Sequence, residues 1–266
     1  MTVSIHPTAI VHPEAVLADD VVIGPFSCIG AKVKIGGGTT VAQSCVIDGD
    51  TSIGANCEIY QGASIGLASQ DLKYKNEPAK VIIGNNNRIR EYVTIHRGTA
   101  ATGQTKIGSD NLLMAYVHVA HDCVVGNECV FANAATLGGH VEVADQVMLG
   151  GLSAVHQFVT VGTRTILGGG SKLASDGLPY AIYDGHPARF RGMNIEGLKR
   201  RGVSAEVRSE LRKAFHMLFD IAGGSRVERL DAIEKAYPGT EEIRNLVAFA
   251  RASKRGIGRP ARGTPE

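Results

Sequence analysis

Aliphatic residues recur at every sixth position over residues 5–173, and this spacing constrains the fold more than any other feature of the chain. Of the 29 positions spaced by six from Ile5 to Leu173, 25 are Ile, Leu or Val. A period of six matches neither the 3.6-residue helix nor the two-residue alternation of a plain strand. It predicts a parallel β-helix, in which each hexad forms one short face and three hexads complete one coil around an aliphatic core.

The fifth residue of most hexads is small, and four of the five cysteines stand there: Cys45, Cys57, Cys123 and Cys129. We interpret them as core residues rather than ligands or nucleophiles. Glycine often follows the aliphatic residue, where we expect it to relieve the turns. An odd cysteine count without a CxxC pair favours a reducing compartment, and we find neither a signal peptide nor an apolar stretch of membrane-spanning length. These features predict a cytoplasmic protein.

Two excursions interrupt the repeat, and the repeat then gives way to a second domain. The first excursion is LASQDLKYKNEPAKVI at 67–82, whose polar and aromatic residues favour a function, and the second is the Gly/Thr-rich segment 98–106. We assign residues 1–178 to the β-helix. Residues 179–266 are expected to form an irregular connector, GLPYAIYDGHPARF, followed by helices.

Three helices are expected in this second domain, where they would also close the open end of the solenoid. Ser204 can cap the first helix, and the others are predicted near 225–237 and 240–253. The last residues, KRGIGRPARGTPE, are expected to be a frayed basic tail whose deletion leaves turnover unchanged.

Charge is unevenly divided between the two domains. Residues 1–178 hold 11 basic and 15 acidic side chains, whereas 179–266 hold 17 basic and 11 acidic. The whole chain has a formal charge of only +2, which gives no indication of nucleic-acid binding. An acidic partner is therefore expected to contact the second domain.

Histidines are predicted to gather on one face of the prism. Between 107 and 173 the repeat is uninterrupted, so residues 18 apart lie one above the other on successive coils. His121, His140 and His156 belong to hexads spaced by 18, and His118 lies at the edge of the lowest one. With coils about 4.8 Å apart, the three imidazoles are expected to form a ladder roughly 10 Å tall.

Three interpretations of this column stay open. His121 is followed at once by Asp122, a pairing that suits a general base oriented by a carboxylate. A metal site built from His118, His121 and His156 is the first alternative, because stacked histidines bind metal in the γ-class carbonic anhydrases. The second alternative is a catalytically silent scaffold.

Several motifs resemble the UDP-N-acetylglucosamine O-acyltransferase family, which performs the first acylation of lipid A biosynthesis in Gram-negative bacteria. The likeness extends over nearly the whole chain. The segments that carry it are QDLKY at 70–74, NRIRE-VTIHRG across 87–98, GSDNLLM at 108–114, AHDC-VGN at 120–127, AVHQF at 154–158 and NIEGLKRRG at 194–202. The resemblance implies a left-handed coil and a homotrimer with active sites between subunits.

The resemblance also implies an activity: transfer of an (R)-3-hydroxyacyl group from acyl carrier protein to the 3-hydroxyl of UDP-N-acetylglucosamine. His121 matches the family's general base, with Asp122 beside it. Gly139 follows His121 by 18 residues, so we expect it one coil above His121, and it matches the family's backbone donor to the oxyanion. A thioester is already activated, so neither a covalent intermediate nor a metal or other cofactor is expected. Acylation of a 3-amino UDP-sugar needs the same base and oxyanion donor, and the sequence does not separate the two acceptors.

Binding residues follow from the same resemblance. Positions that match contacts to the sugar nucleotide or acyl donor are Gln70, Asp71, Lys73, His118, His140, His156 and Gln157. Positions that match contacts near the nucleotide are Asn194, Glu196, Arg200 and Arg201, although the arginine pair also fits a solvated charge run. Gly169 falls where the family sets acyl length, and a glycine there is expected to leave room for a long chain.

Overall fold

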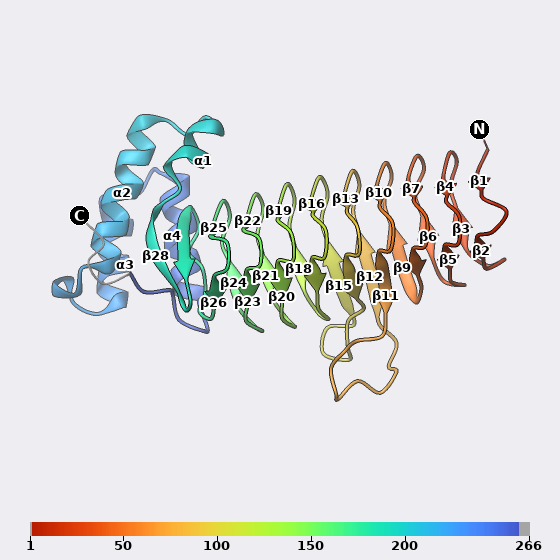
Figure 1. Cartoon of the computed structure of the whole chain (residues 1–266). Coiled ribbons are helices and arrows are strands. Elements are labelled where there is room, and N and C mark those ends of the chain that lie inside the picture. Colours follow the sequence, from red (N-terminus) through yellow and green to blue (C-terminus); the bar gives the residue numbers. More distant parts are fainter. Residues whose placement is uncertain (1, 261–266) are drawn as a thin grey trace.

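The computed structural model describes residues 2–260, which form a three-sided prism of stacked coils with a helical cluster at its C-terminal end (Figure 1). Each coil contributes one short strand to each of three parallel sheets, and the prediction of a left-handed parallel β-helix is confirmed. The aliphatic residue of each hexad points inward, so that Ile47, Ile65 and Leu137 are fully buried. The cysteines at the fifth position are buried and free, as expected.

The strands divide among three sheets, which we call A, B and C. Sheet A contains β1 (Ser4–Ile5), β4 (Val22–Ile23), β7 (Thr40–Val41), β10 (Glu58–Ile59), β13 (Arg88–Ile89), β16 (Leu112–Leu113), β19 (Val130–Phe131), β22 (Met148–Leu149), β25 (Ile166–Leu167), β27 (Ala181–Gly185) and β28 (Ala188–Met193). Sheet B contains β2 (Ile10–Val11), β5 (Cys28–Ile29), β8 (Val46–Ile47), β11 (Ser64–Leu67), β14 (Thr94–His96), β17 (His118–Val119), β20 (Thr136–Leu137), β23 (Ala154–Val155) and β26 (Lys172–Leu173). Sheet C contains β3 (Val16–Leu17), β6 (Lys34–Ile35), β9 (Asp50–Ile53), β12 (Lys80–Ile83), β15 (Gln104–Ile107), β18 (Val124–Val125), β21 (Glu142–Val143) and β24 (Thr160–Val161).

The two excursions leave the prism without disturbing the six-residue phase. Ile53 pairs with Ile83, thirty residues later, and Ile83 pairs with Ile107, twenty-four residues later, whereas an uninterrupted coil takes eighteen. The excursions therefore add twelve and six residues, both multiples of six. Both loops project from the same side of the prism, below β11, β12 and β15 (Figure 1).

Glycine does not provide most of the turns. The fourth residue of nearly every hexad has a positive φ, and it is usually not glycine, as at Tyr116, Asp122 and His140. The glycines after the aliphatic residue allow close approach of adjacent coils instead, since a Cβ on Gly36 would lie 2.6 Å from the carbonyl carbon of Gly54. Our expectation that glycine relieves the turns was therefore wrong for most coils.

The segment expected to be an irregular connector is a β-hairpin. β27 pairs in parallel with β25 and antiparallel with β28, so sheet A continues beyond the last coil. Tyr183 of β27 is fully buried, and Phe190 of β28 stacks on Phe215 of the helical cluster at 5.1 Å. The hairpin is how the prism joins the helices. The division at residue 178 stays a prediction.

The helical cluster contains α1 (Ile195–Arg200), α2 (Ala205–Phe219), the 3-10 helix η1 (Ile221–Gly223), α3 (Arg226–Ala236) and α4 (Glu241–Ala252). The three expected helices are confirmed, with Ser204 capping α2 and Ser225 forming a capping box on α3. The short helix α1 was not expected. No helix among residues 2–260 is long and apolar enough to span a membrane.

The C-terminal segment is more ordered than expected up to residue 260. Asp176 donates its backbone N–H to Gly256 O at 2.8 Å and accepts from Gly258 N–H at 3.0 Å, and its carboxylate accepts from Ser253 Oγ at 2.7 Å. Phe190 N–H donates to Arg259 O at 2.9 Å. The description of this segment as a frayed tail is wrong for 256–260, while 261–266 lie outside the described residues.

Candidate active site

The predicted histidine column lies at one edge of the prism, in the turns that follow β17, β20 and β23. We call residues 120–123, 138–141 and 156–159 the histidine corner. The rings of His121 and His140 meet edge to face, with centroids 5.1 Å apart. The ring stacked on His140 is Phe158, at 4.5 Å. His156 lies in the turn after β23 of sheet B, where its Nδ1 is 3.0 Å from Gln157 O. The predicted ladder therefore has Phe158, not His156, as the ring above His140.

Asp122 is the most enclosed polar group of the corner, with a side chain that is 0% exposed. Its Oδ1 accepts from Thr99 N–H at 3.0 Å, and its Oδ2 accepts from Thr99 Oγ1 at 2.7 Å. Thr102 Oγ1 also contacts Oδ1. Burial by itself raises the pKa of a carboxyl, but hydrogen bonds from Thr102, Thr99 and His121 outweigh it and lower the pKa of Asp122 to about 2. The carboxylate is therefore ionised at neutral pH.

This charge sets the tautomer of His121. His121 Nδ1 lies 2.8 Å from Asp122 Oδ2, and an ionised carboxylate can only accept a hydrogen bond. Nδ1 must therefore carry the proton, which leaves the lone pair of a neutral imidazole on Nε2. The side chain is 14% exposed, so a substrate hydroxyl can reach it. The arrangement is that of an oriented general base.

Gly139 lies directly over the imidazole, one coil further along the prism. A Cβ at this position would lie 2.5 Å from His121 Cε1 and 2.6 Å from Nε2, so only glycine leaves the ring its space. Among residues 2–260, no acceptor lies within hydrogen-bonding range of the Gly139 N–H. A free backbone donor beside a base is a suitable partner for a developing oxyanion.

His118 forms a second, neutral histidine site next to the corner. Its Nδ1 lies 2.7 Å from Thr94 Oγ1, and its ring centroid is 5.4 Å from that of His96. Burial first, and then the positive charges that His96 and His121 can carry, lower the pKa of His118 to about 4. His118 is therefore neutral at physiological pH and suited to hydrogen bonding.

The metal alternative named His118, His121 and His156, and these three do not form a cluster. The group with metal-ligand spacing among the described residues is His121, Asp122 and His140, whose ligand atoms lie within 4.8 Å of one another. In that group Asp122 already accepts hydrogen bonds from Thr99 and from His121. The donors around it fit a carboxylate that orients an imidazole.

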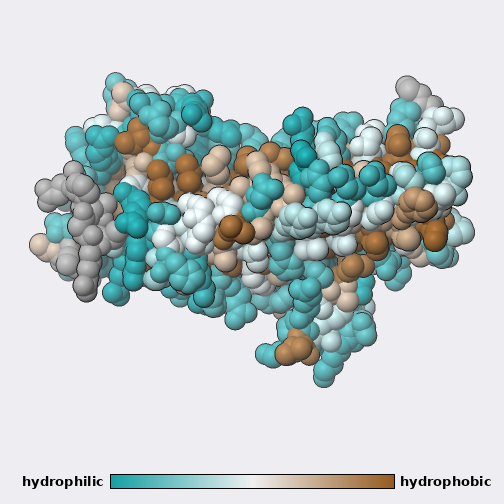
Figure 2. Space-filling model, in the orientation of Figure 1, coloured by the Kyte–Doolittle hydropathy of each residue, from teal (hydrophilic) through white to brown (hydrophobic). Residues whose placement is uncertain are grey.

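The predicted loop residues Gln70, Asp71 and Lys73 lie together in the first excursion. Gln70 and Lys73 are exposed, and Asp71 Oδ1 accepts from Lys73 N–H at 3.0 Å, which closes a tight turn. Between them Leu72 is fully exposed. Figure 2 shows hydrophobic surface at the tip of this projecting loop.

The predicted nucleotide-side residues lie on α1, away from the histidine corner. Asn194 is buried and caps α1, with Oδ1 accepting from Gly197 N–H at 2.9 Å and Nδ2 donating to Arg164 O at 2.9 Å. Glu196 pairs with Lys199 at 2.9 Å, and Arg201 pairs with Glu128 of the prism. Arg200 is exposed. Within one chain, Asn194 has a structural role and Arg201 is already paired.

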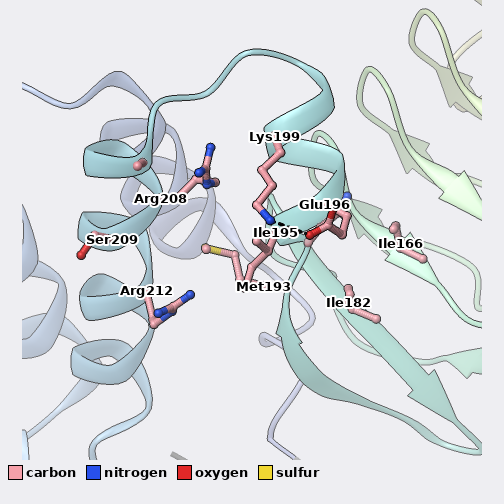
Figure 3. Close-up of a pocket in the computed structure, with 11 residues that line it drawn as sticks. Ile166, Ile182, Met193, Ile195, Glu196, Lys199, Arg208, Ser209 and Arg212 are labelled. Atoms are coloured by element: carbon pink, nitrogen blue, oxygen red, sulfur yellow. Dashed lines mark hydrogen bonds and ion pairs between the residues drawn. The ribbon is translucent and has the colours of Figure 1, made fainter.

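A basic groove separates α1 from α2 (Figure 3). Arg208 and Arg212 extend from α2 toward α1, where Lys199 lies. The apolar part of the lining consists of Ile166, Ile182, Met193, Ile195 and Ala205. Cations around an apolar floor suit an acidic, amphipathic partner.

Comparison with known proteins supports the family resemblance seen in the sequence motifs. The family model described as "Udp N-acetylglucosamine O-acyltransferase; Domain 2" matches residues 176–258, and that described as "Bacterial transferase hexapeptide (six repeats)" matches 104–139. The acyl-[acyl-carrier-protein]–UDP-N-acetylglucosamine O-acyltransferase of Aliarcobacter butzleri is 45% identical over 258 residues, which is 96% of this chain and 97% of that protein. The chain belongs to the UDP-N-acetylglucosamine O-acyltransferase family.

Solved structures agree with this membership. LpxA from Acinetobacter baumannii superposes with a TM-score of 0.93 at 44% identity, covering 96% of this chain and 99% of that one. UDP-N-acetylglucosamine acyltransferase from Francisella novicida superposes with a TM-score of 0.94 at 35% identity, covering 97% and 95%. The predicted family and fold are confirmed, and the chain is an acyltransferase of this O-acyltransferase family.

Gly169 lies at a different corner of the prism from His121. It is exposed in the turn after β25 of sheet A, stacked over Gly151, where an added Cβ would lie 3.3 Å from Gly151 O. His121 follows sheet B. Within one chain, Gly169, the predicted acyl-length position, and His121, the predicted base, therefore lie at different corners of the prism.

Four residues at or beside this corner were not predicted from the sequence: Thr99, Thr102, His96 and Phe158. The two threonines come from the second excursion, and no spacing signal links them to Asp122. Phe158 stands 18 residues after His140, so the column rule that placed Gly139 over His121 could have found it. His96 lies in the segment VTIHRG at 93–98, so the family resemblance is the signal that points to it.

Proposed function

We propose that this protein transfers an (R)-3-hydroxyacyl group from acyl carrier protein to the 3-hydroxyl of UDP-N-acetylglucosamine, an early step of lipid A biosynthesis. The observation that carries the proposal is the hydrogen bond of 2.8 Å from His121 Nδ1 to the buried Asp122, with Gly139 directly above the ring. Relatives that are 45% identical and named for this reaction support the two substrates.

The reaction proceeds by direct attack on the thioester. His121 Nε2 removes the proton from the sugar hydroxyl as its oxygen attacks the carbonyl carbon, and the Gly139 N–H stabilises the oxyanion. When the tetrahedral intermediate collapses, the C–S bond breaks and the imidazolium returns the proton to the thiolate of the carrier. Because the thioester is already activated, we propose that no covalent enzyme intermediate and no cofactor are needed. The other residues matched at this corner, His118, His140, His156 and Gln157, are proposed to hold the substrates.

We further propose a homotrimer with active sites between subunits. Tyr92 and Tyr116 stack at 5.3 Å on the outside of the sheet A corner, where they are 51% and 61% exposed, and Leu152 continues the same column. We call these three residues the apolar column. Packing this corner against the histidine corner of the next chain would cover the apolar side chains. It would also bring Gly169 toward His121 and give the convex site a second wall.

The basic groove is the proposed docking site of the acidic carrier protein. Arg208, Arg212 and Lys199 provide its cations, although Lys199 also pairs with Glu196 of the same groove at 2.9 Å. The net charge of residues 179–266 is also positive. Such binding is expected to weaken as salt rises. Carrier binding that is unchanged between low and moderate salt would contradict this docking site. We also propose a cytoplasmic location, because all five cysteines are free.

The test is acyl transfer by the purified protein with 3-hydroxyacyl carrier proteins of several chain lengths and excess chelator. Parallel reactions contain UDP-N-acetylglucosamine or the corresponding 3-amino sugar nucleotide as acceptor. We expect acyl transfer to the hydroxyl acceptor, unaffected by chelation. Transfer to the amino sugar alone would contradict the proposed acceptor. Loss of transfer with chelator would contradict the proposed metal independence.

A further inference from the structure

A fully buried carboxylate at the edge of a prism needs partners, and those of Asp122 come from outside the coil. Four donor groups approach its two oxygens: Thr99 N–H, Thr99 Oγ1, the Thr102 hydroxyl and His121 Nδ1. Three of the four belong to the second excursion. Thr102 Oγ1 also lies 2.9 Å from Gln104 O, but an ionised carboxylate is the stronger acceptor.

These contacts fix the carboxylate in one orientation. Thr99 bridges both oxygens, and Thr102 adds a second donor on Oδ1. Oδ2 is the oxygen that also accepts a hydrogen bond from His121 Nδ1. If the carboxylate turned, the imidazole would lose the partner that keeps its proton on Nδ1. The geometry of the base therefore depends on the excursion as well as on the coil.

We infer that Thr99 and Thr102 are positioning residues, which hold Asp122 against His121 so that Nε2 stays free to accept the substrate proton. The inference rests on the proposed function and adds two residues that do not touch the reacting atoms. A threonine hydroxyl bonded to Asp122 also takes up part of its negative charge.

The excursion that carries these threonines is itself fixed to the first one. Glu77 Oε1 accepts from Ala100 N–H at 3.2 Å, and Arg97 Nε donates to Tyr74 Oη at 2.8 Å. Tyr74 and Glu77 follow the turn that contains Asp71 and Lys73. The loop that contains Asp71 and Lys73, which match contacts to the sugar nucleotide or acyl donor, is thus connected by hydrogen bonds to the loop that orients His121.

The direction of the pH effect follows from the charges around His121. Asp122 contacts it directly, and His118 is close enough to interact with it electrostatically. His140 Nε2 lies 3.7 Å from Asp122 Oδ2, and Glu77 interacts electrostatically with Asp122. Removing a hydroxyl that bonds to Asp122 concentrates charge on the carboxylate, which stabilises the His121 imidazolium. The acidic limb of kcat/KM should then move to higher pH.

The test compares Thr99→Val and Thr102→Val with Thr99→Ser and Thr102→Ser in the transfer assay. We expect each Val variant to lower kcat roughly tenfold and to move the acidic limb upward by roughly half a unit, with KM for UDP-N-acetylglucosamine little changed. The Ser variants should restore both properties, because they keep the hydroxyl. Thr102 is exposed, so its substitution should not impair folding.

Thr39→Val is the matched control for loss of a buried hydroxyl. Thr39 Oγ1 donates to Gly54 O at 2.8 Å, and Thr39 lies several coils before the histidine corner. We expect this control to lower the midpoint of thermal unfolding without moving the pH profile. Val variants with wild-type kcat and an unmoved pH profile would overturn the inference. An inactive wild-type protein would instead contradict the proposed function.

Discussion

At the scale of single residues, the site depends on one carboxylate that stays ionised although it is buried. The hydrogen bonds from Thr102, Thr99 and His121 lower the pKa of Asp122 to about 2 against the effect of burial. A group whose pKa is lower in the folded state stabilises the fold above its unfolded pKa, near 4 for Asp, and loses that contribution as the pH falls toward 2. The same charge that orients His121 thus stabilises the fold.

We expect Asp122→Asn to lower the free energy of unfolding by about 2 kcal/mol near pH 6, because a pKa difference of one unit corresponds to roughly 1.4 kcal/mol. The difference from wild type should shrink as the pH is lowered from 4 to 2. Urea unfolding across this range measures it, with the exposed Asp19→Asn as control. A constant difference at all pH values would show that the ionised charge is not the source.

At this scale, the sequence predicts which residues stack on successive coils. It does not predict the contacts between the second excursion and the coil. Eighteen-residue spacing correctly placed Gly139 over His121, since the coil is regular there. It could not connect Thr99 with Asp122, because the excursion has no period. We also expected glycine to relieve the turns, whereas the coil geometry imposes a positive φ on Asp122 and His140 themselves.

At the scale of elements, backbone pairing joins the irregular segments to the coil: the hairpin β27–β28 pairs with β25, and residues 256–259 bond to Asp176 and Phe190. The hexad period predicted the coils because one aliphatic residue per face must fill the axis. The hairpin β27–β28 escaped prediction, since its glycines and prolines resemble those of a loop and only the exposed edge of β25 makes it a strand. The three longer helices α2, α3 and α4 were predictable from their caps and apolar spacing, whereas the short helix α1 was not.

The C-terminal segment provides a test at this scale. A chain that ends after Ser253 loses the backbone hydrogen bonds from residues 256–259 to Asp176 and Phe190. We expect it to unfold with roughly 3 kcal/mol less free energy, at about 1 kcal/mol for each of three bonds. Removal of 261–266 alone keeps those bonds and is the matched control. Equal stability of the two truncated chains would contradict the role given to 256–260.

At the scale of the whole molecule, the residues matched to the site lie at separate corners of one chain, and this separation supports the proposed trimer. The proposed base, His121, lies after sheet B, Gly169 lies after sheet A, and the basic groove lies between α1 and α2. The six-residue repeat of one chain assigns each residue to a corner of the prism. It cannot show which corners meet, because in the proposed trimer that contact depends on a second copy.

We expect Tyr116→Glu to prevent trimer formation, because it places a charge in the apolar column. Sedimentation should give the wild type three times the 28.0 kDa of one chain and the variant a smaller mass, with transfer lost together with assembly. Val227 of α3 is 58% exposed, similar to Tyr116, so Val227→Glu should stay trimeric and active. A trimeric Tyr116→Glu protein would place the interface elsewhere.

The most direct test of the proposed mechanism is the rate of acyl transfer to UDP-N-acetylglucosamine by His121→Ala. The control is His216→Ala, which removes an exposed histidine of α2. With Asp122 and Gly139 left in place, loss of the base should lower kcat by two or more orders of magnitude, roughly the contribution of general-base catalysis. The control should keep the wild-type rate. A His121→Ala protein that is folded and transfers the acyl group within tenfold of the wild-type rate would contradict the assignment of His121 as the base.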